Sequence, residues 1–191
     1  MNLVVNGDAE SGPGGGSAPV GSVVGWTIRQ GAPALIAYSL GGGYPTPSDP
    51  GPAPRGSRFF SGGNSPVTEL VQDVVVPAGV DAGSVRYTLG GWLGGYLGQE
   101  DGVQLSVEFR DAKGAPLALS VLGPVGSGER AARTALLQRS VTSTVPPGAR
   151  SARVRLVFTR AGGTSNDGYA DAVSLVLSGL TGLTGVSGGA A

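Results

Sequence analysis

Acidic residues stand in glycine-containing turns near both ends of the chain. Asp8 and Glu10 lie in the opening stretch VVNGDAESG, and Asp171 lies in NDGYADAVSLVL, where an alternating apolar run follows. Short acids, together with the carbonyls that a glycine turn exposes, are oxygen ligands of the kind that calcium binds. The alternative is that Asn, Asp and Gly are present only because hairpin turns favour them. The pattern therefore predicts either a shared cation site, which requires the two ends to meet, or two ordinary turns.

Aromatic and polar side chains gather in two glycine-rich stretches. The denser stretch, GGWLGGYLGQED, contributes Trp92, Tyr96, Gln99, Glu100 and Asp101. The second, PRGSRFFSGGN, places Arg58 before Phe59 and Phe60, which strand alternation sends to opposite faces. Sugar-binding sites combine an aromatic surface with a few polar groups that fix hydroxyls. The two stretches are therefore the candidate ligand surface.

Each of these residues also has a structural interpretation. A tryptophan in a strand more often packs in the core than it forms a ligand platform, so Trp26 is expected to be a core residue. Trp92 and Tyr96 remain open between core and platform. The long loop at 41–56 either covers a binding site or is an inert surface loop. Arg58 either binds sugar hydroxyls through its guanidinium fork or pairs with an acid, Glu69 or Glu100.

The residue types that the chain lacks exclude most enzyme chemistry. It has no Cys and no His, which removes disulfides, ordinary zinc sites, thiol nucleophiles and triads built on imidazole. Thirteen cationic and thirteen acidic residues leave no net charge, so nucleic acid is disfavoured as a partner. Glu100 and Asp101 are adjacent and would point apart on a strand, which argues against a glycosidase pair. We therefore expect a protein without catalytic activity.

Alternation of apolar and polar residues predicts an all-β fold, a two-sheet antiparallel β-sandwich. VQLSVEF is the clearest strand, and a turn at 111–116 predicts that it forms a hairpin with the strand that follows. The one helical candidate, 128–140, has only a weak apolar stripe. About eight strands are predicted, at 25–30, 34–39, 68–76, 85–93, 103–109, 116–122, 152–158 and 173–177.

The chain is expected to form one domain at 1–178, followed by a flexible, glycine-rich tail or linker at 179–191. The uncharged end of the chain is short for a membrane span and rich in glycine, so we expect no membrane insertion. The first residues, MNLVVNG, lack the cationic start and the apolar region of a signal peptide.

Seven segments follow one another between residues 2 and 177: NLVVNGDAESG, GWTIRQG, ELVQDVVVPAG, VRYTLGGWLGG, VQLSVEFRDAKGAPL, TSTVPPGARSARVRLVF and DGYADAVSLVL. Together they resemble the galactose-binding-like jelly rolls, notably the carbohydrate-binding modules of families 4, 9 and 22. The resemblance implies that the N-terminal turn and the last strand lie side by side, often with a structural calcium between them. It implies that Glu10 and Asp171 are calcium ligands, with Asp8 placed to share the ion, whereas Asp167 is expected to be a turn residue.

The resemblance also implies a noncatalytic module that binds a carbohydrate, an extracellular or cell-surface glycan. The alternative is a structural or assembly role, in which the same jelly roll self-associates in a particle, fibre or surface layer. The lack of a signal peptide and the uncharged tail favour that alternative slightly. Glycan binding and light scattering would distinguish the two functions.

Overall fold

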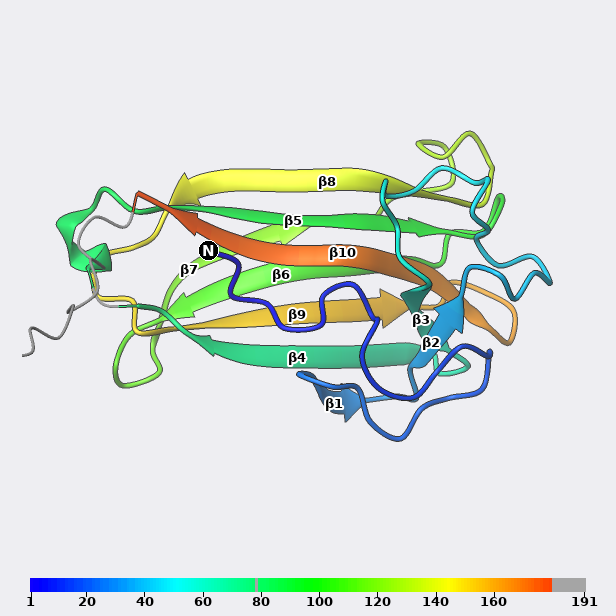
Figure 1. Cartoon of the computed structure of the whole chain (residues 1–191), viewed down its shortest axis with the longest axis horizontal. Helices are drawn as coiled ribbons and strands as arrows, with labels where there is room; N and C mark the ends of the chain where they lie inside the picture. The colour runs from blue at the N-terminus through cyan, green and yellow to red at the C-terminus, as the bar shows by residue number, and fades with distance from the viewer. Residues whose placement is uncertain (78, 180–191) are drawn as a thin grey trace, which may run out of the picture.

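The computed structural model describes residues 1–77 and 79–179 as a two-layer β-sandwich (Figure 1). The first sheet contains, in spatial order, β1 (Thr27–Gln30), β4 (Val67–Val75), β9 (Ser151–Thr159), β6 (Gly102–Arg110) and β7 (Pro116–Leu122). The second sheet contains β2 (Ala34–Ala37), β3 (Arg58–Gly63), β10 (Asn166–Ser178), β5 (Arg86–Gly95) and β8 (Ala135–Thr144). Neighbouring strands in both sheets are antiparallel. The predicted all-β sandwich is confirmed, with ten strands in place of about eight.

β3 and β8 are the two strands that the alternating pattern did not predict. Five of the six residues of β3 are buried, so its sequence, RFFSGG, shows no polar face. β8 begins inside the helical candidate at 128–140, where turns end at Thr134 and the chain becomes extended. The helical alternative is therefore wrong: β8 pairs with β5 along its whole length, which satisfies its backbone groups without a helix. The only helical element among the described residues is a 3₁₀ turn, η1 (Val80–Ala82).

The main core lies between the sheets and follows the predicted alternation. Val103, Leu105, Val107 and Phe109 of β6 are all buried in it. Trp26 is also a core residue, 7% exposed, with its ring edge-on to Phe60 at 5.8 Å. The prediction for Trp26 is confirmed, and the hairpin of β6 and β7 forms as expected.

The N-terminal segment runs alongside β10 (Figure 1). The backbone amide of Leu3 donates to the carbonyl of Leu175 over 2.8 Å, and the amide of Val173 donates to the carbonyl of Gly7, also over 2.8 Å. Gly7 permits this approach, because a Cβ there would lie 1.9 Å from the Val173 carbonyl oxygen. The two ends of the domain therefore meet, as the resemblance to the galactose-binding-like jelly rolls implied.

The described residues contain no helix with the length and hydrophobicity that a membrane span requires. Except for Gly179, the predicted tail at 179–191 lies outside the described residues.

Candidate functional site

A second apolar cluster covers the outer face of the second sheet, away from the main core. Strand alternation produces it, because Phe60 points into the sandwich and Phe59 points outward, as predicted. Ring centroids lie 4.8 Å apart for Tyr38 and Phe59 and 5.3 Å apart for Phe59 and Tyr169. We call this group the outer aromatic cluster; it comprises Ala34, Ile36, Tyr38, Phe59, Leu136 and Tyr169, with Tyr44, Trp92 and Tyr96 packed against it.

Two neighbouring cavities open beside the outer aromatic cluster. Their volumes are about 500 and 200 Å³, and both are lined by Tyr44, Tyr96 and the glycines between residues 41 and 44. The larger cavity adds polar groups from Thr46, Asp49, Arg133 and Thr134, and the smaller one adds Ser165, Asp167 and Tyr169. We call the two together the tyrosine hollow. The tyrosine hollow combines three tyrosine side chains with hydroxyl groups and with charged groups of both signs.

The loop at 41–56 forms one wall of the tyrosine hollow and is held in place by Arg55. The Arg55 guanidinium donates to the carbonyls of Thr46 and Asp49, both over 2.7 Å, and lies 5.1 Å from the centre of the Tyr38 ring. Gly43 has a φ of 94°, and a Cβ there would lie 3.0 Å from the Tyr96 ring. The loop therefore packs directly on Tyr96. It is a wall of the candidate site, and both alternatives for this loop, cover of a binding site or inert surface loop, stay predictions.

A carboxyl group and a phenol meet in the smaller cavity. The Tyr169 hydroxyl donates to Asp167 Oδ1 over 2.9 Å. Burial raises the pKa of Asp167, and Asp101 adds to the shift through its negative charge. Burial also raises the pKa of Tyr169. The Asp167 carboxyl and the Tyr169 hydroxyl therefore offer the smaller cavity hydrogen-bonding groups that are partly shielded from water.

Trp92 and Tyr96 have intermediate positions between core and surface. Both side chains are half-buried and pack against the outer aromatic cluster. Tyr96 lines the tyrosine hollow, whereas Trp92 lies on β5, next to the edge strand, between Asp171 of β10 and Gln138 of β8. Each residue thus keeps one apolar side in the protein and part of its surface accessible, as a sugar platform requires.

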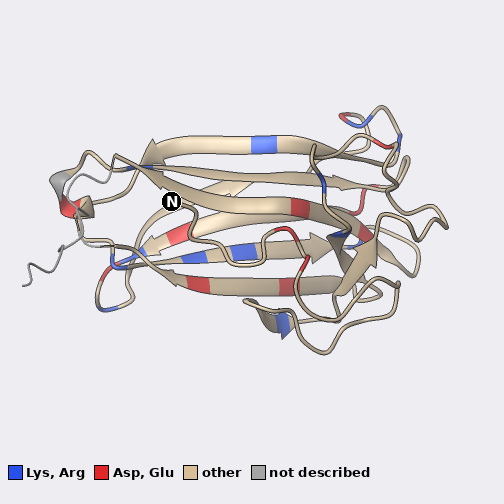
Figure 2. Cartoon of the chain, in the orientation of Figure 1, with Lys and Arg blue, Asp and Glu red and all other residues tan. Residues whose placement is uncertain are grey.

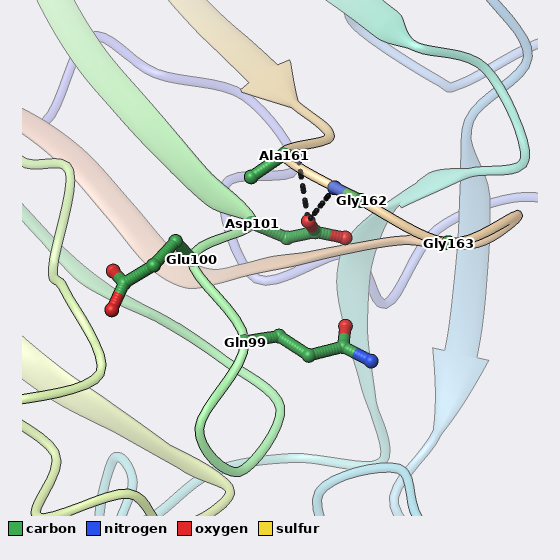
Figure 3. Close-up of a pocket in the computed structure, with 6 residues that line it drawn as sticks. All are labelled: Gln99, Glu100, Asp101, Ala161, Gly162 and Gly163. Carbon is green, nitrogen blue, oxygen red and sulfur yellow. Dashed lines mark hydrogen bonds between the residues drawn. The ribbon is translucent and has the colours of Figure 1, made fainter.

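Gln99, Glu100 and Asp101 line a separate cavity of about 310 Å³ with residues 161–163 (Figure 3). Asp101 is 2% exposed, and its Oδ1 accepts from the amides of Ala161 and Gly162 over 2.7 and 3.3 Å. Its Oδ2 accepts from the amide of Asp167 over 2.8 Å. The Asp101 carboxylate therefore connects the loop before β10 and the start of β10 to the start of β6, and in this structure all its hydrogen bonds go to the backbone.

Glu100 points away from Asp101 and is exposed (Figure 3). Its carboxylate accepts hydrogen bonds from the amide and the hydroxyl of Ser127, and these bonds lower the pKa of Glu100. The two acids diverge, as the sequence predicted, and they do not face one another across a cleft.

Arg58 lies at the N-terminal loop and lines neither cavity of the tyrosine hollow. Its guanidinium donates to the carbonyl of Gly12 over 2.9 Å and to the carbonyl of Glu10. The expected pairing with an acid does not form, because Glu69 pairs with Arg155 and Glu100 binds Ser127. Arg58 holds the N-terminal loop on the second sheet.

The acids at the meeting point of the two ends differ in burial and in their hydrogen-bond partners. Asp171 is 1% exposed; it accepts a hydrogen bond from the Tyr38 hydroxyl and one from the Ala172 amide, both over 2.6 Å. Burial raises the pKa of Asp171 to about 7, with smaller contributions from the negative charges of Glu10 and Asp8, although the hydrogen bonds from Tyr38 and Ala172 oppose the rise. Glu10 Oε1 accepts from the amides of Ser57 and Arg58 over 2.7 and 2.8 Å.

These acids fit a cation in charge but do not complete its coordination shell. In residues 1–77 and 79–179, no three acidic side chains come together as a group that could hold a metal ion. Calcium takes about six to eight oxygens, so backbone carbonyls and water would have to supply most of them. Burial and the two acidic neighbours favour the protonated form of Asp171, and a bound cation would shift the balance towards the carboxylate.

The alternating pattern missed several residues of the site. Tyr44 lies in the loop at 41–56, and Tyr169 is the one aromatic residue of β10, but no periodic pattern marks either position as part of a site. Arg130 was also missed. It is 2% exposed, and its guanidinium donates to the carbonyls of Gly95, Leu97, Gln99 and Arg133, so it orders the loop that follows Tyr96.

Solved structures show the same fold, although no protein-family model and no curated protein matches the sequence. A structure described as family 16 carbohydrate-binding module-2 has a TM-score of 0.59 and 19% identity, covering 92% of this chain and 99% of its own. A cyclase from Fischerella sp. TAU has a TM-score of 0.61 and 14% identity, covering 93% of this chain and 98% of its own. The fold that the sequence resemblance implied is confirmed. Because that fold carries both a binding module and an enzyme, the site has to decide the function.

Proposed function

We propose that this domain binds carbohydrate without catalysis and that the tyrosine hollow receives the sugar. The observation that carries the proposal is that Tyr44 and Tyr96 line two neighbouring cavities together with hydroxyl, carboxylate and guanidinium groups. A pyranose has an apolar face that packs on an aromatic ring and hydroxyls that need polar partners. The likeness in fold to a carbohydrate-binding module agrees with this function.

The polar groups of the hollow suit a neutral sugar. The Asp49 carboxylate can accept hydrogen bonds, and the Arg133 guanidinium can donate them, so the two charges offset each other. Thr46 and Thr134 add hydroxyl groups. The wall formed by the 41–56 loop is already fixed by Arg55, so little conformational entropy is lost when a ligand binds. We expect the ligand to be a glycan of an extracellular or cell-surface polymer.

A structural calcium at Glu10 and Asp171, near Asp8, is the second part of the proposal. The support is electrostatic: a cation would offset the charge of a buried carboxylate whose neighbours are acids. When bound, calcium would join the N-terminal loop to β10, residues separated by most of the chain. It would lie away from the tyrosine hollow's lining residues, so its role would be in stability rather than in ligand contact.

A glycan array with the wild-type domain and the Tyr44→Ala variant tests the proposed function. We expect the wild type to bind a restricted set of glycans and the variant to lose that binding while it keeps the same circular dichroism spectrum. Leu40→Ala is the matched control. Leu40 is an exposed apolar residue next to the loop, and it lines neither cavity. An array on which the wild type binds nothing, or on which Tyr44→Ala binds equally well, would contradict the proposal.

A further inference from the structure

β7 forms one edge of the first sheet and exposes an apolar stripe. The outward residues Leu117, Leu119 and Val121 are 42%, 60% and 48% exposed. They account for three of the ten exposed large hydrophobic residues in the described chain, on a single strand of seven residues. Of the alternate residues on the same strand, Leu122 is buried in the main core, and Ala118 and Ser120 are half-buried. The exposed stripe is therefore a property of one edge and not of the surface in general.

The edge also lacks the features that usually prevent strands from pairing. Pro116–Leu122 reads PLALSVL, with no charged residue, and its proline stands at the first position, where a missing amide matters least. The edge strand of the second sheet differs, since β8 presents Gln138, Ser140 and Thr142 on its outer face. An unprotected edge with free backbone groups is a template for another strand.

We infer that β7 pairs with β7 of a second copy of this chain, antiparallel and across a two-fold axis at Leu119. Pairing the whole strand with itself places residue 116 opposite 122, 117 opposite 121, and 119 opposite 119. This register keeps every side chain on its own face, because partners differ by an even number of positions. Leu119 then packs on its copy, and Leu117 packs on Val121 of the copy.

Charge supports a second copy as the occupant. The chain has thirteen cationic and thirteen acidic residues, so no net repulsion opposes its self-association. The charged residues nearest the stripe, Glu108 and Arg110 of β6, pair with each other at 2.5 Å, one strand back from the edge. In the two-fold arrangement an uncharged strand from each copy separates these ion pairs. The contact is isologous, so it closes at a dimer.

Sedimentation velocity over a concentration series tests the dimer. We expect wild-type chains to form a dimer whose fraction rises with concentration. Leu119→Lys should raise the dissociation constant about tenfold or more, because two like charges would meet at the axis. Ser140→Lys, on the exposed edge of the other sheet, is the matched control and should leave the dissociation constant within about twofold. Equal melting temperatures at low concentration show that the variants fold.

Cysteine substitutions test the register, because the chain has no cysteine of its own. Opposed strand residues have Cα atoms about 4.5 to 5.5 Å apart, which suits a disulfide. Leu119→Cys should therefore form a covalent dimer under mild oxidation, and Leu117→Cys alone should not. A mixture of Leu117→Cys and Val121→Cys should restore the cross-link. A wild type that stays monomeric at every concentration, a dimer that Leu119→Lys leaves intact, or equal cross-linking by both single variants would overturn the inference.

Discussion

The outer faces of the two sheets are built in opposite ways. On β4, β9 and β6 of the first sheet, charges of opposite sign lie on neighbouring strands, whereas the edge strand β7 exposes its apolar stripe. Figure 2 shows blue bands on β9 beside red bands on β4. Arg153 of β9 binds both oxygens of Asp73 of β4 over 2.7 and 2.6 Å, and its other strand neighbour is Glu108. On the second sheet, the outer aromatic cluster takes the place of these charges.

The two faces therefore differ in what stabilises them. The charged side chains of the first are stable in contact with water, whereas the aromatic side chains of the second are stabilised when a ligand or another part of the protein covers them. Surface ion pairs need only water around them and contribute little to stability. Aromatic residues on an outer face are stabilised by burial. The loop at 41–56 buries part of the outer aromatic cluster, and the tyrosine hollow remains as an open cavity beside it. The comparison predicts that substitutions on the two faces will have different consequences for stability and for binding.

The largest expected effect is on stability and comes from Phe59→Ala. Phe59 is 0% exposed in the outer aromatic cluster, so its removal leaves a cavity and should cost about 3 to 5 kcal/mol. Arg155→Ala on the first sheet should cost less than about 1 kcal/mol, because that pair is partly exposed to solvent. Urea unfolding measures both. Equal losses for the two variants would mean that the cluster does not act as a second core.

Calcium should give the next largest effect. A ligand that binds only the folded state at a hundred times its dissociation constant stabilises that state by about 2.7 kcal/mol, so the melting temperature should rise by roughly 5 to 10 °C. Glu10→Gln and Asp171→Asn should abolish this response, and Asp167→Asn, on the same strand as Asp171, should keep it. Superimposable calorimetric melts with calcium and with chelator would show that these acids hold no ion.

The smallest effect should come from the ion pair between Asp73 and Arg153. The Asp73 side chain is 53% exposed, so a double-mutant cycle should give a coupling free energy of about 0.2 to 1 kcal/mol. The hydrogen bonds from Arg153 lower the pKa of Asp73, so the coupling should be present above the unfolded pKa of about 4. It should be lost as the pH falls through the lower folded pKa. A coupling that persists when Asp73 is protonated would contradict an ionic origin.

The sequence predicted the parts of the fold that depend on a regular period. The strands with one polar face and the opposite directions of Phe59 and Phe60 follow from alternation, whereas the meeting of the two ends was implied by the resemblance to the galactose-binding-like jelly rolls. β3 and β8 were missed for physical reasons: β3 is buried on both faces, and β8 contains good helix formers whose extended state depends on pairing with β5. Tertiary pairing outweighed local propensity there.

The candidate site was less predictable, because loops have no period. Glu100 and Asp101 are adjacent acids in the sequence, but only the position of residues 161–167, the loop before β10 and the start of that strand, makes one exposed and the other a buried backbone acceptor. Tyr96 was predicted, whereas its neighbour Tyr44 comes from a loop whose path depends on Arg55. A long-range contact of this kind cannot be read from spacing along the chain.

Isothermal titration with the tightest glycan from the array tests the proposed binding site most directly, with one variant from each outer face. We expect Tyr96→Ala to weaken binding about tenfold or more, since the sugar loses an aromatic surface worth at least about 1.4 kcal/mol, and to change the melting temperature little. Arg155→Ala should bind within about twofold of the wild type, because its guanidinium pairs with Glu69 on the opposite sheet. Unchanged affinity in Tyr96→Ala, or a loss in Arg155→Ala of the same size, would contradict carbohydrate binding in the tyrosine hollow.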